Sequence, residues 1–173
     1  DGSFVYNIYL NGPAAKAGVL PGDLISAVDG ENIEDSADLA AMVARMDAGS
    51  EVGLTVVRQG DLIDILLEIG LRPEDATSGV AWPGLSAVSL TEEMRNRLGS
   101  SAAGGDVVIA SVLPESPAAQ VGLRSGDIIV EVDDSEVGSI LEFYRLLAES
   151  GRGGVELTIA RQGRALSVDL PRR

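Results

Sequence analysis

The chain contains two copies of one sequence unit. Residues 12–29 read GPAAKAGVLPGDLISAVD and recur as SPAAQVGLRSGDIIVEVD at residues 116–133, an offset of 104 positions. Further on, LTVVRQG at residues 54–60 recurs as LTIARQG at residues 157–163, an offset of 103. Solenoid repeats are only about 20–50 residues long. The longer period therefore indicates a duplicated domain, with one residue lost within the second copy.

Each copy is expected to open with a strand and a short helix. Residues 4–10 and 107–113 are apolar and rich in β-forming residues, which is typical of short buried strands. Pro13 and Pro117 then favour the first turn of a helix, where the missing N–H of proline is tolerated. The glycines five residues later are suited to end that helix.

A second strand and a tight turn follow. We expect strands at residues 24–28 and 128–132, each ending at a two-residue hairpin turn. Asp29-Gly30 is a favoured pair for such a turn. Asp133-Asp134, its counterpart, is a weaker signal, because Asp adopts positive φ less readily than Gly.

An amphipathic helix and a closing hairpin complete the unit. Ser36 is expected to cap a helix whose apolar residues recur at spacings of three and four. Ser139, with Glu142 three residues on, resembles a capping box for the corresponding helix. Residues 54–69 and 157–170 are expected to form hairpins around the Arg-Gln-Gly turns.

These elements predict an α+β fold with two domains in tandem. We expect each domain to be a small, partly open β-barrel or sandwich with two helices. The boundaries are placed at residues 1–71 and 80–173, and the polar segment 72–79, which contains Pro and Gly, is interpreted as a linker. The segment 80–105 has no counterpart ahead of Asp1, so the first copy is expected to be truncated at its N-terminus.

Composition excludes several classes of function. The chain has 173 residues, no His, no Cys and a formal charge of −14, and Lys16 is its single lysine. Nucleophile relays that need His or Cys are therefore absent, as are ordinary zinc and haem sites. The acidic balance disfavours nucleic acid. We expect no catalytic residue, metal or cofactor in this chain, and neither a membrane span nor a signal peptide.

The repeated residues resemble a known family. Pro-Ala-Ala-x-x-Gly-(Val/Leu)-x-x-Gly-Asp-(Leu/Ile)-Ile, then Val-Asp, a capped helix and an Arg-Gln-Gly hairpin, is similar to bacterial PDZ domains. Two such units in tandem look like the C-terminal half of the HtrA/Deg (Do-type) serine proteases of the bacterial envelope. The resemblance implies a non-catalytic module that captures unfolded polypeptide or protein C-termini by strand addition, for protein quality control in the periplasm.

The resemblance also implies a binding site. A carboxylate loop would precede a peptide-pairing strand, and the amphipathic helix would form the opposite wall of a groove. In the second copy these residues are Trp82, Pro83, Gly84 and Leu85 in the loop, Ser86, Ala87 and Val88 in the strand, and Phe143, Leu146 and Leu147 on the helix. The helix counterparts in the first copy are Leu39, Met42 and Val43, for which no pairing strand is visible.

Pro83 departs from what a carboxylate loop needs. Gly84 and Leu85 would donate their N–H groups to the ligand carboxylate, but proline has none to give. Losing one charge-assisted bond weakens binding about tenfold or more. The second groove is therefore expected to bind weakly or to prefer internal segments. Gly84→Val and Leu146→Asp are each expected to abolish binding while leaving the fold intact.

Three other readings stay open. The tandem could be an assembly element of a homo-oligomer, its grooves occupied by neighbouring subunits. Its parent could be a membrane-embedded site-2-type metalloprotease, a class that also carries paired PDZ domains. An enzyme built on carboxylates or on Lys16 alone is a third alternative.

The acidic cluster Asp133, Asp134 and Glu136 is interpreted as solvated turn residues, because it lacks the alternating ligands of a calcium loop.

Overall fold

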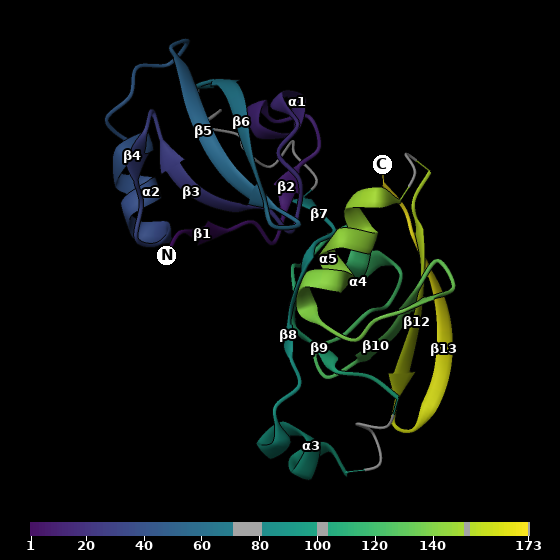
Figure 1. Cartoon of the computed structure of the whole chain (residues 1–173). Helices are drawn as coiled ribbons and strands as arrows, with labels where there is room; N and C mark the ends of the chain where they lie inside the picture. The colour runs from purple at the N-terminus through teal and green to yellow at the C-terminus, as the bar shows by residue number, and fades with distance from the viewer. Residues whose placement is uncertain (71–80, 100–103, 151–152, 173) are drawn as a thin grey trace. The chain divides into compact units, whose positions relative to one another are not determined.

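The computed structural model describes residues 1–70, 81–99, 104–150 and 153–172. The chain forms two compact units, Asp1–Gly79 and Val80–Arg173 (Figure 1). The expected linker 72–79 lies outside the described residues. Within the described ranges, no helix has both the length and the apolar character that crossing a bilayer requires.

Unit 1 is an antiparallel sheet with two helices. Its elements are β1 (Ser3–Phe4), β2 (Ile8–Tyr9), α1 (Pro13–Ala17), β3 (Leu24–Val28), β4 (Glu31–Asn32), α2 (Ser36–Val43), β5 (Glu51–Arg58) and β6 (Asp61–Glu68). The strand order is β1-β3-β5-β6, and β4 pairs with β3. Alternate apolar side chains of β5, such as Val52, Leu54 and Val56, point to one face and form the core of the unit.

Unit 2 repeats this plan and extends it. Its elements are β7 (Ala81–Trp82), β8 (Leu85–Ser89), α3 (Glu92–Leu98), β9 (Val107–Val112), α4 (Pro117–Gln120), β10 (Ile128–Val132), β11 (Ser135–Glu136), α5 (Ile140–Glu149), β12 (Val155–Arg161) and β13 (Arg164–Leu170). The strand order is β13-β12-β10-β9-β8, and β11 pairs with β10. The helix α5 lies beside β8 and β10 (Figure 1).

The two copies share register as well as sequence. Ser3 pairs with Ile25 in unit 1, and Val107, 104 positions later, pairs with Ile129 in unit 2. The pairing of β3 with β5 and that of β10 with β12 are each interrupted by a register shift just after Ile25 or Ile129. The duplication expected from the sequence is therefore a duplication of the fold.

The turn with the weaker sequence signal adopts the same conformation as its counterpart. Asp29 and Gly30 have φ of 49° and 79°, and Asp133 and Asp134 have φ of 46° and 61°. The first Asp of each turn is held in place by the neighbouring strand. Its side chain accepts the N–H of Gly53 at 2.7 Å in unit 1 and that of Glu156 at 2.9 Å in unit 2. Asp is among the few residues that adopt left-handed backbone angles, and these bonds to the neighbouring strand hold it there.

The expected strand over residues 4–10 is wrong in its length. In unit 1 the segment forms only the short strands β1 and β2, whereas β9 in unit 2 runs unbroken from Val107 to Val112. The far half of β9 pairs with β8, with Leu85 opposite Val112. Unit 1 has no strand equivalent to β8 among its described residues. Without that second partner the extended segment is held by fewer ladder bonds and divides.

The cap expected at Ser36 is also wrong. Ser36 is the first helical residue of α2, and Asp35 is the N-cap, accepting the N–H groups of Ala37 and Asp38 at 2.8 and 3.0 Å. The cap at Ser139 is confirmed, since its Oγ accepts the N–H of Glu142 at 3.1 Å. The side chain of Glu142 reaches one residue further back than a capping box requires and accepts the N–H of Gly138 at 3.0 Å.

In each unit an ion pair with a buried aspartate joins the Gly-Asp motif to the Arg-Gln-Gly motif. Arg58 meets Asp23 through two bonds of 2.7 Å, and Arg161 meets Asp127 through bonds of 2.6 and 2.7 Å. The aspartates are only 1% and 2% exposed, and their hydrogen bonds raise the pKa of the paired arginines. Two parallel bonds match the planar guanidinium to the carboxylate. The Gly-Asp and Arg-Gln-Gly motifs are therefore two halves of one structural contact.

Candidate functional site

The strand β8 lies at the edge of the unit 2 sheet. Among the described residues of the unit, β8 is the last strand of its sheet and pairs with β9 alone. Gly84 accepts a bond from Leu113 at 2.8 Å, and Leu90 donates one to Asp106 at 2.7 Å. The backbone N–H and C=O groups alternate in direction along a strand. Those of the odd-numbered residues between Gly84 and Leu90 therefore point away from β9. Ala87 is the middle one of these.

The outward N–H of Ala87 is not exposed to water. It donates to the hydroxyl of Tyr144 on α5 at 3.3 Å, in a buried contact. Leu85 and Ala87 on β8 and Phe143, Tyr144 and Leu147 on α5 are all fully buried. The rings of Phe143 and Tyr144 meet edge to face, with 4.9 Å between their centroids. In this state the side chains of α5 close the space beside β8.

The loop before β8 is held from the C-terminal side of the unit. Trp82 is buried and donates its indole N–H to the carbonyl of Pro171 at 3.1 Å. The guanidinium of Arg172 lies 4.3 Å from the centre of the Trp82 ring, a cation–π contact. Arg172 also donates to the carbonyl of Ser150, at the C-terminal end of α5, at 3.3 Å.

Arg172 is a partly buried cation beside Trp82 and the C-terminal end of α5. Burial lowers its pKa. No carboxylate pairs with it among the residues that the structure describes. A guanidinium in this setting can bind an incoming anion more strongly than a solvated one, because water competes less.

Gly84 has a structural role that the sequence did not reveal. It has φ of +83°, and a Cβ at this position would overlap the side chain of Ser116. The hydroxyl of Ser116 donates to the carbonyl of Gly84 at 3.1 Å. The expectation that Gly84→Val leaves the fold intact is therefore wrong, because the larger side chain has no room.

The residues expected in the binding site divide by burial. Pro83, Gly84 and Leu85 are buried, as are Phe143 and Leu147. Ser86, Val88 and Leu146 are half-buried, and the hydroxyl of Ser86 is 2.7 Å from that of Ser111 on β9. The structure therefore brings the expected loop, strand and helix together, and whether they bind a ligand stays a prediction.

Tyr144, like Arg172, is a residue of this site that the sequence interpretation missed. It follows Ile140 by four positions and precedes Leu147 by three, the spacing of one helix face. That periodicity could have identified it as inward-facing. Its hydroxyl contact with Ala87 depends on how α5 and β8 approach each other, which no local pattern encodes.

Unit 1 has the helix of such a site without the strand. Leu39, Met42 and Val43 of α2 are half-buried and pack against the core of unit 1. No residue of α2 is fully buried, whereas α5 has three such residues. The described part of unit 1 therefore has no counterpart of the β8 edge.

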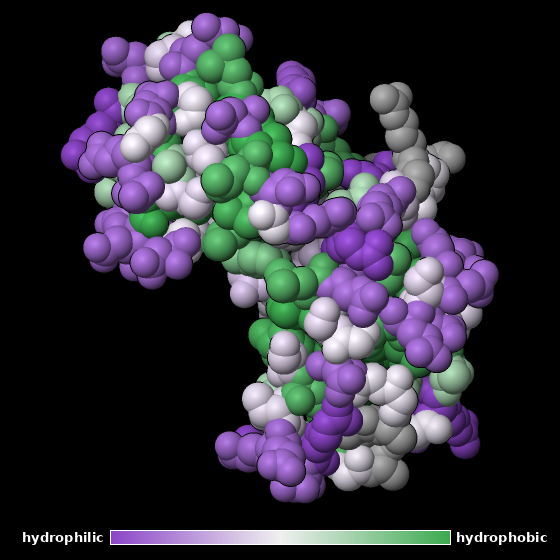
Figure 2. Space-filling model, in the orientation of Figure 1, coloured by the Kyte–Doolittle hydropathy of each residue, from purple (hydrophilic) through white to green (hydrophobic). Residues whose placement is uncertain are grey.

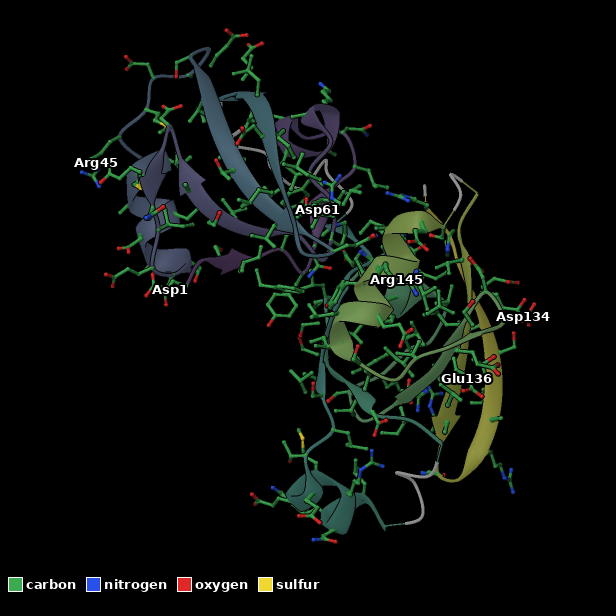
Figure 3. The ribbon with its side chains drawn as sticks, viewed as in Figure 1. Asp1, Arg45, Asp61, Asp134, Glu136 and Arg145 are labelled. Atoms are coloured by element: carbon green, nitrogen blue, oxygen red, sulfur yellow. The ribbon has the colours of Figure 1, made fainter. Side chains whose placement is uncertain are left out.

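Other features of unit 2 do not resemble a reactive site. A cavity of about 300 Å³ is lined by Arg95, Asp106, Glu136 and neighbouring residues, and Arg95 in it is already paired with Asp106. Asp134 lies in the exposed turn between β10 and β11, and Glu136 is an exposed residue of β11 (Figure 3). Over the described ranges, no cluster of three or more His, Cys, Asp or Glu side chains is placed to hold a metal ion.

Comparison with known families decides the class of the protein. Family models described as PDZ domains match residues 1–69 and 108–161. The chain is a tandem of PDZ domains. This confirms the family expected from the repeated motifs and the α+β fold of two small domains. The chain corresponds to the PDZ region of its relatives and is not itself catalytic.

The curated relatives are much longer proteins. A "Probable periplasmic serine endoprotease DegP-like" of Pseudomonas putida (strain GB-1) is 34% identical over 95% of this PDZ tandem and 36% of its own length. A protein of the same description from Brucella suis is 35% identical over 98% of the tandem and 34% of itself. The "Periplasmic serine endoprotease DegP" of Salmonella typhimurium is 32% identical over 84% of the tandem and 29% of itself. The chain thus spans about a third of these relatives, whose names describe periplasmic serine endoproteases.

Solved structures show a looser likeness. The HtrA3 PDZ domain bound to a phage-derived ligand matches 51% of this chain and 81% of its own, with 21% identity and a TM-score of 0.45. The HtrA-type protease AlgW with a decapeptide matches 86% of this chain and 54% of its own, with 18% identity and a TM-score of 0.47.

Proposed function

We propose that unit 2 binds an extended polypeptide by adding it as a strand to the free side of β8, against α5. The observation that carries the proposal is the position of β8 at the end of its sheet, with the backbone of Ala87 directed away from β9. A strand edge supplies N–H and C=O groups for any sequence, and side pockets add selectivity. The ligand class is therefore unfolded polypeptide or protein C-termini.

The end of the groove favours a ligand with a free carboxylate more than the loop sequence alone suggests. Pro83 offers no N–H, which leaves the backbone nest one donor short. Arg172 lies against Trp82 at that end and has no carboxylate partner among the described residues. A guanidinium replaces the missing donor with a full charge. We therefore propose that C-termini bind with Arg172 as a contact, and internal segments bind without it.

We propose that the chain is the substrate-binding and regulatory part of a serine endoprotease that acts on damaged proteins in the bacterial periplasm. The proposal is supported by relatives whose names give a periplasmic serine endoprotease and of which this chain spans about a third. Binding without catalysis suits a chain that has no His and no Cys.

A peptide-binding assay tests the proposal directly. Peptides of one sequence with free and with amidated C-termini are titrated against the chain, and the fluorescence of Trp82, the single tryptophan, reports binding. We expect saturable binding, weakened tenfold or more by Leu146→Asp, which places a charge on a half-buried position of α5. The matched control is Leu141→Asp on the same helix, where the side chain is 67% exposed. Equal losses at both positions, or none, would show that the groove is misplaced.

A second candidate function is assembly with other subunits. Leu62 and Leu66 on β6 are 72% and 64% exposed, and apolar surface lies over β5 and β6 of unit 1 (Figure 2). Exposed apolar patches often mark protein interfaces. Sedimentation of the chain at several concentrations separates the two candidates. Concentration-dependent association that Leu66→Ser abolishes supports assembly, and a strict monomer that binds peptide rejects it.

A further inference from the structure

The bond from Ala87 to Tyr144 occupies the group that an added strand would use. An incoming antiparallel strand bonds to the backbone groups of β8 that face away from β9. Ala87 has the central one of these N–H groups, and the hydroxyl of Tyr144 accepts it at 3.3 Å. The tyrosine oxygen therefore stands in for the ligand carbonyl that strand addition would place there.

The hydroxyl is not needed to fill the core. Phe143 and Leu147 flank Tyr144 on the buried side of α5, and all three are fully buried. Residue 40 of α2 corresponds to Tyr144 when the two helices are aligned on their N-caps, and it is an exposed alanine. A phenylalanine would supply the same ring, so what it would remove at this amide is the acceptor for the Ala87 N–H.

We propose that Tyr144 is a specificity-determining residue of the β8 groove, an internal competitor that every ligand must displace. This inference rests on the proposed function, since it concerns the same groove. In the free protein the hydroxyl satisfies Ala87. In the complex a backbone carbonyl of the ligand takes its place at the Ala87 N–H, and the phenol hydroxyl moves away from that amide.

The competition sets a threshold for ligands. The apparent affinity of a site that is mostly closed is reduced by the fraction of molecules in which it is open. Segments able to form several backbone bonds at once overcome the closure, whereas single contacts do not. Extended, unfolded chain is therefore selected over short or folded segments that present one acceptor.

Tyr144→Phe tests the proposal, because it keeps the ring and removes the oxygen. A net hydrogen bond corresponds to about a two- to tenfold change in an equilibrium constant. We expect Tyr144→Phe to bind an extended peptide tighter by that factor and to unfold at a lower temperature, because the free protein loses the bond and the complex does not. Tyr9→Phe is the matched control, since Tyr9 is 53% exposed in unit 1. It is expected to change neither quantity.

Hydrogen exchange at the Ala87 amide gives a readout that a purely structural role would not move. We expect faster exchange in free Tyr144→Phe than in the free natural chain, and equal, slow exchange once peptide is bound to either. The wild-type measurement needs no variant, so it also covers the case in which Tyr144→Phe fails to fold. There, added peptide should keep the Ala87 amide protected while the Tyr144 ring resonances shift.

The outcomes separate this proposal from the function on which it rests. Peptide binding that is equal or weaker in Tyr144→Phe, or ring resonances that stay unchanged in the wild-type complex, would contradict the role of Tyr144 as a competitor. Neither result would contradict strand addition to β8. Absence of binding to both proteins would overturn both proposals. Binding to Tyr144→Phe alone would support both, with the competitor strong enough to close the natural groove.

Discussion

Several single residues of this chain make structural contacts that their local sequence does not indicate. The buried pairs of Asp23 with Arg58 and of Asp127 with Arg161 connect positions 35 and 34 residues apart. Each pair joins the start of one strand to the end of another. A sequence motif shows that Gly-Asp and Arg-Gln-Gly recur, and only the folded unit shows that they recur together because they bind each other.

Gly84 provides the test at this scale. We expect Gly84→Ala to lower the stability of unit 2 by more than about 2 kcal/mol, because left-handed backbone strain is added to the overlap with Ser116. Gly126→Ala is the control, since Gly126 has φ of +91° and open space around its Cβ position. It should lose only about 1 kcal/mol from the backbone angle. Urea unfolding followed by Trp82 fluorescence measures both. Equal losses would mean that the Ser116 overlap is relieved at no cost.

At the scale of elements, the corresponding helices α2 and α5 differ in what they pack against. When the two helices are aligned on their N-caps, Leu39 corresponds to Phe143 and Val43 corresponds to Leu147. The residues of α5 are fully buried and those of α2 half-buried. Apolar periodicity predicts that both helices have an inward face. The depth of burial depends on whether a strand such as β8 lies beside the helix.

The start of α2 provides a test of element boundaries. Asp35→Ala removes the acceptor of two main-chain N–H groups and is expected to destabilise unit 1 by about 1 kcal/mol. Ser36→Ala removes a side chain that caps nothing and should change stability by less than about 0.5 kcal/mol. Hydrogen exchange of the β3 amides measures the stability of unit 1 separately from that of unit 2. A larger effect from Ser36 than from Asp35 would contradict the cap assignment.

For the whole molecule, net charge is the property with a consequence for ligands. The chain carries a formal charge of −14, which raises the local concentration of cations and repels anions. Lysine-flanked peptides are expected to bind several-fold tighter than glutamate-flanked peptides of the same core at about 0.01 M salt, where the Debye length is about 30 Å.

Ionic strength separates this long-range effect from direct contacts. The preference for lysine flanks should vanish near 1 M salt, where the Debye length is about 3 Å. A peptide with neutral flanks is the control, and its affinity should change little between the two conditions. A preference for lysine that persists at high salt would indicate direct pairing with specific carboxylates instead.

Much of the fold could be predicted from sequence because its signals are local and occur twice. Strands at residues 24–28 and 128–132, the turns at Asp29 and Asp133 and the cap at Ser139 follow from patterns only a few residues long. The errors at residues 4–10 and at Ser36 arose where a neighbouring strand or a competing carboxylate decides the boundary. Similarly, the loop, strand and helix of the candidate site could be placed, but not the way they close on one another.

The amino-acid sequence by itself determined that this chain folds as two copies of one small domain, because periodicity, turn residues and caps act over short distances and recur in both copies. Only the tertiary structure decided that Ala87 meets Tyr144, that Arg172 stacks on Trp82, and that Gly84 has no space for a side chain. These contacts join residues far apart in the chain. Their geometry depends on how whole elements pack, which no short stretch of sequence specifies.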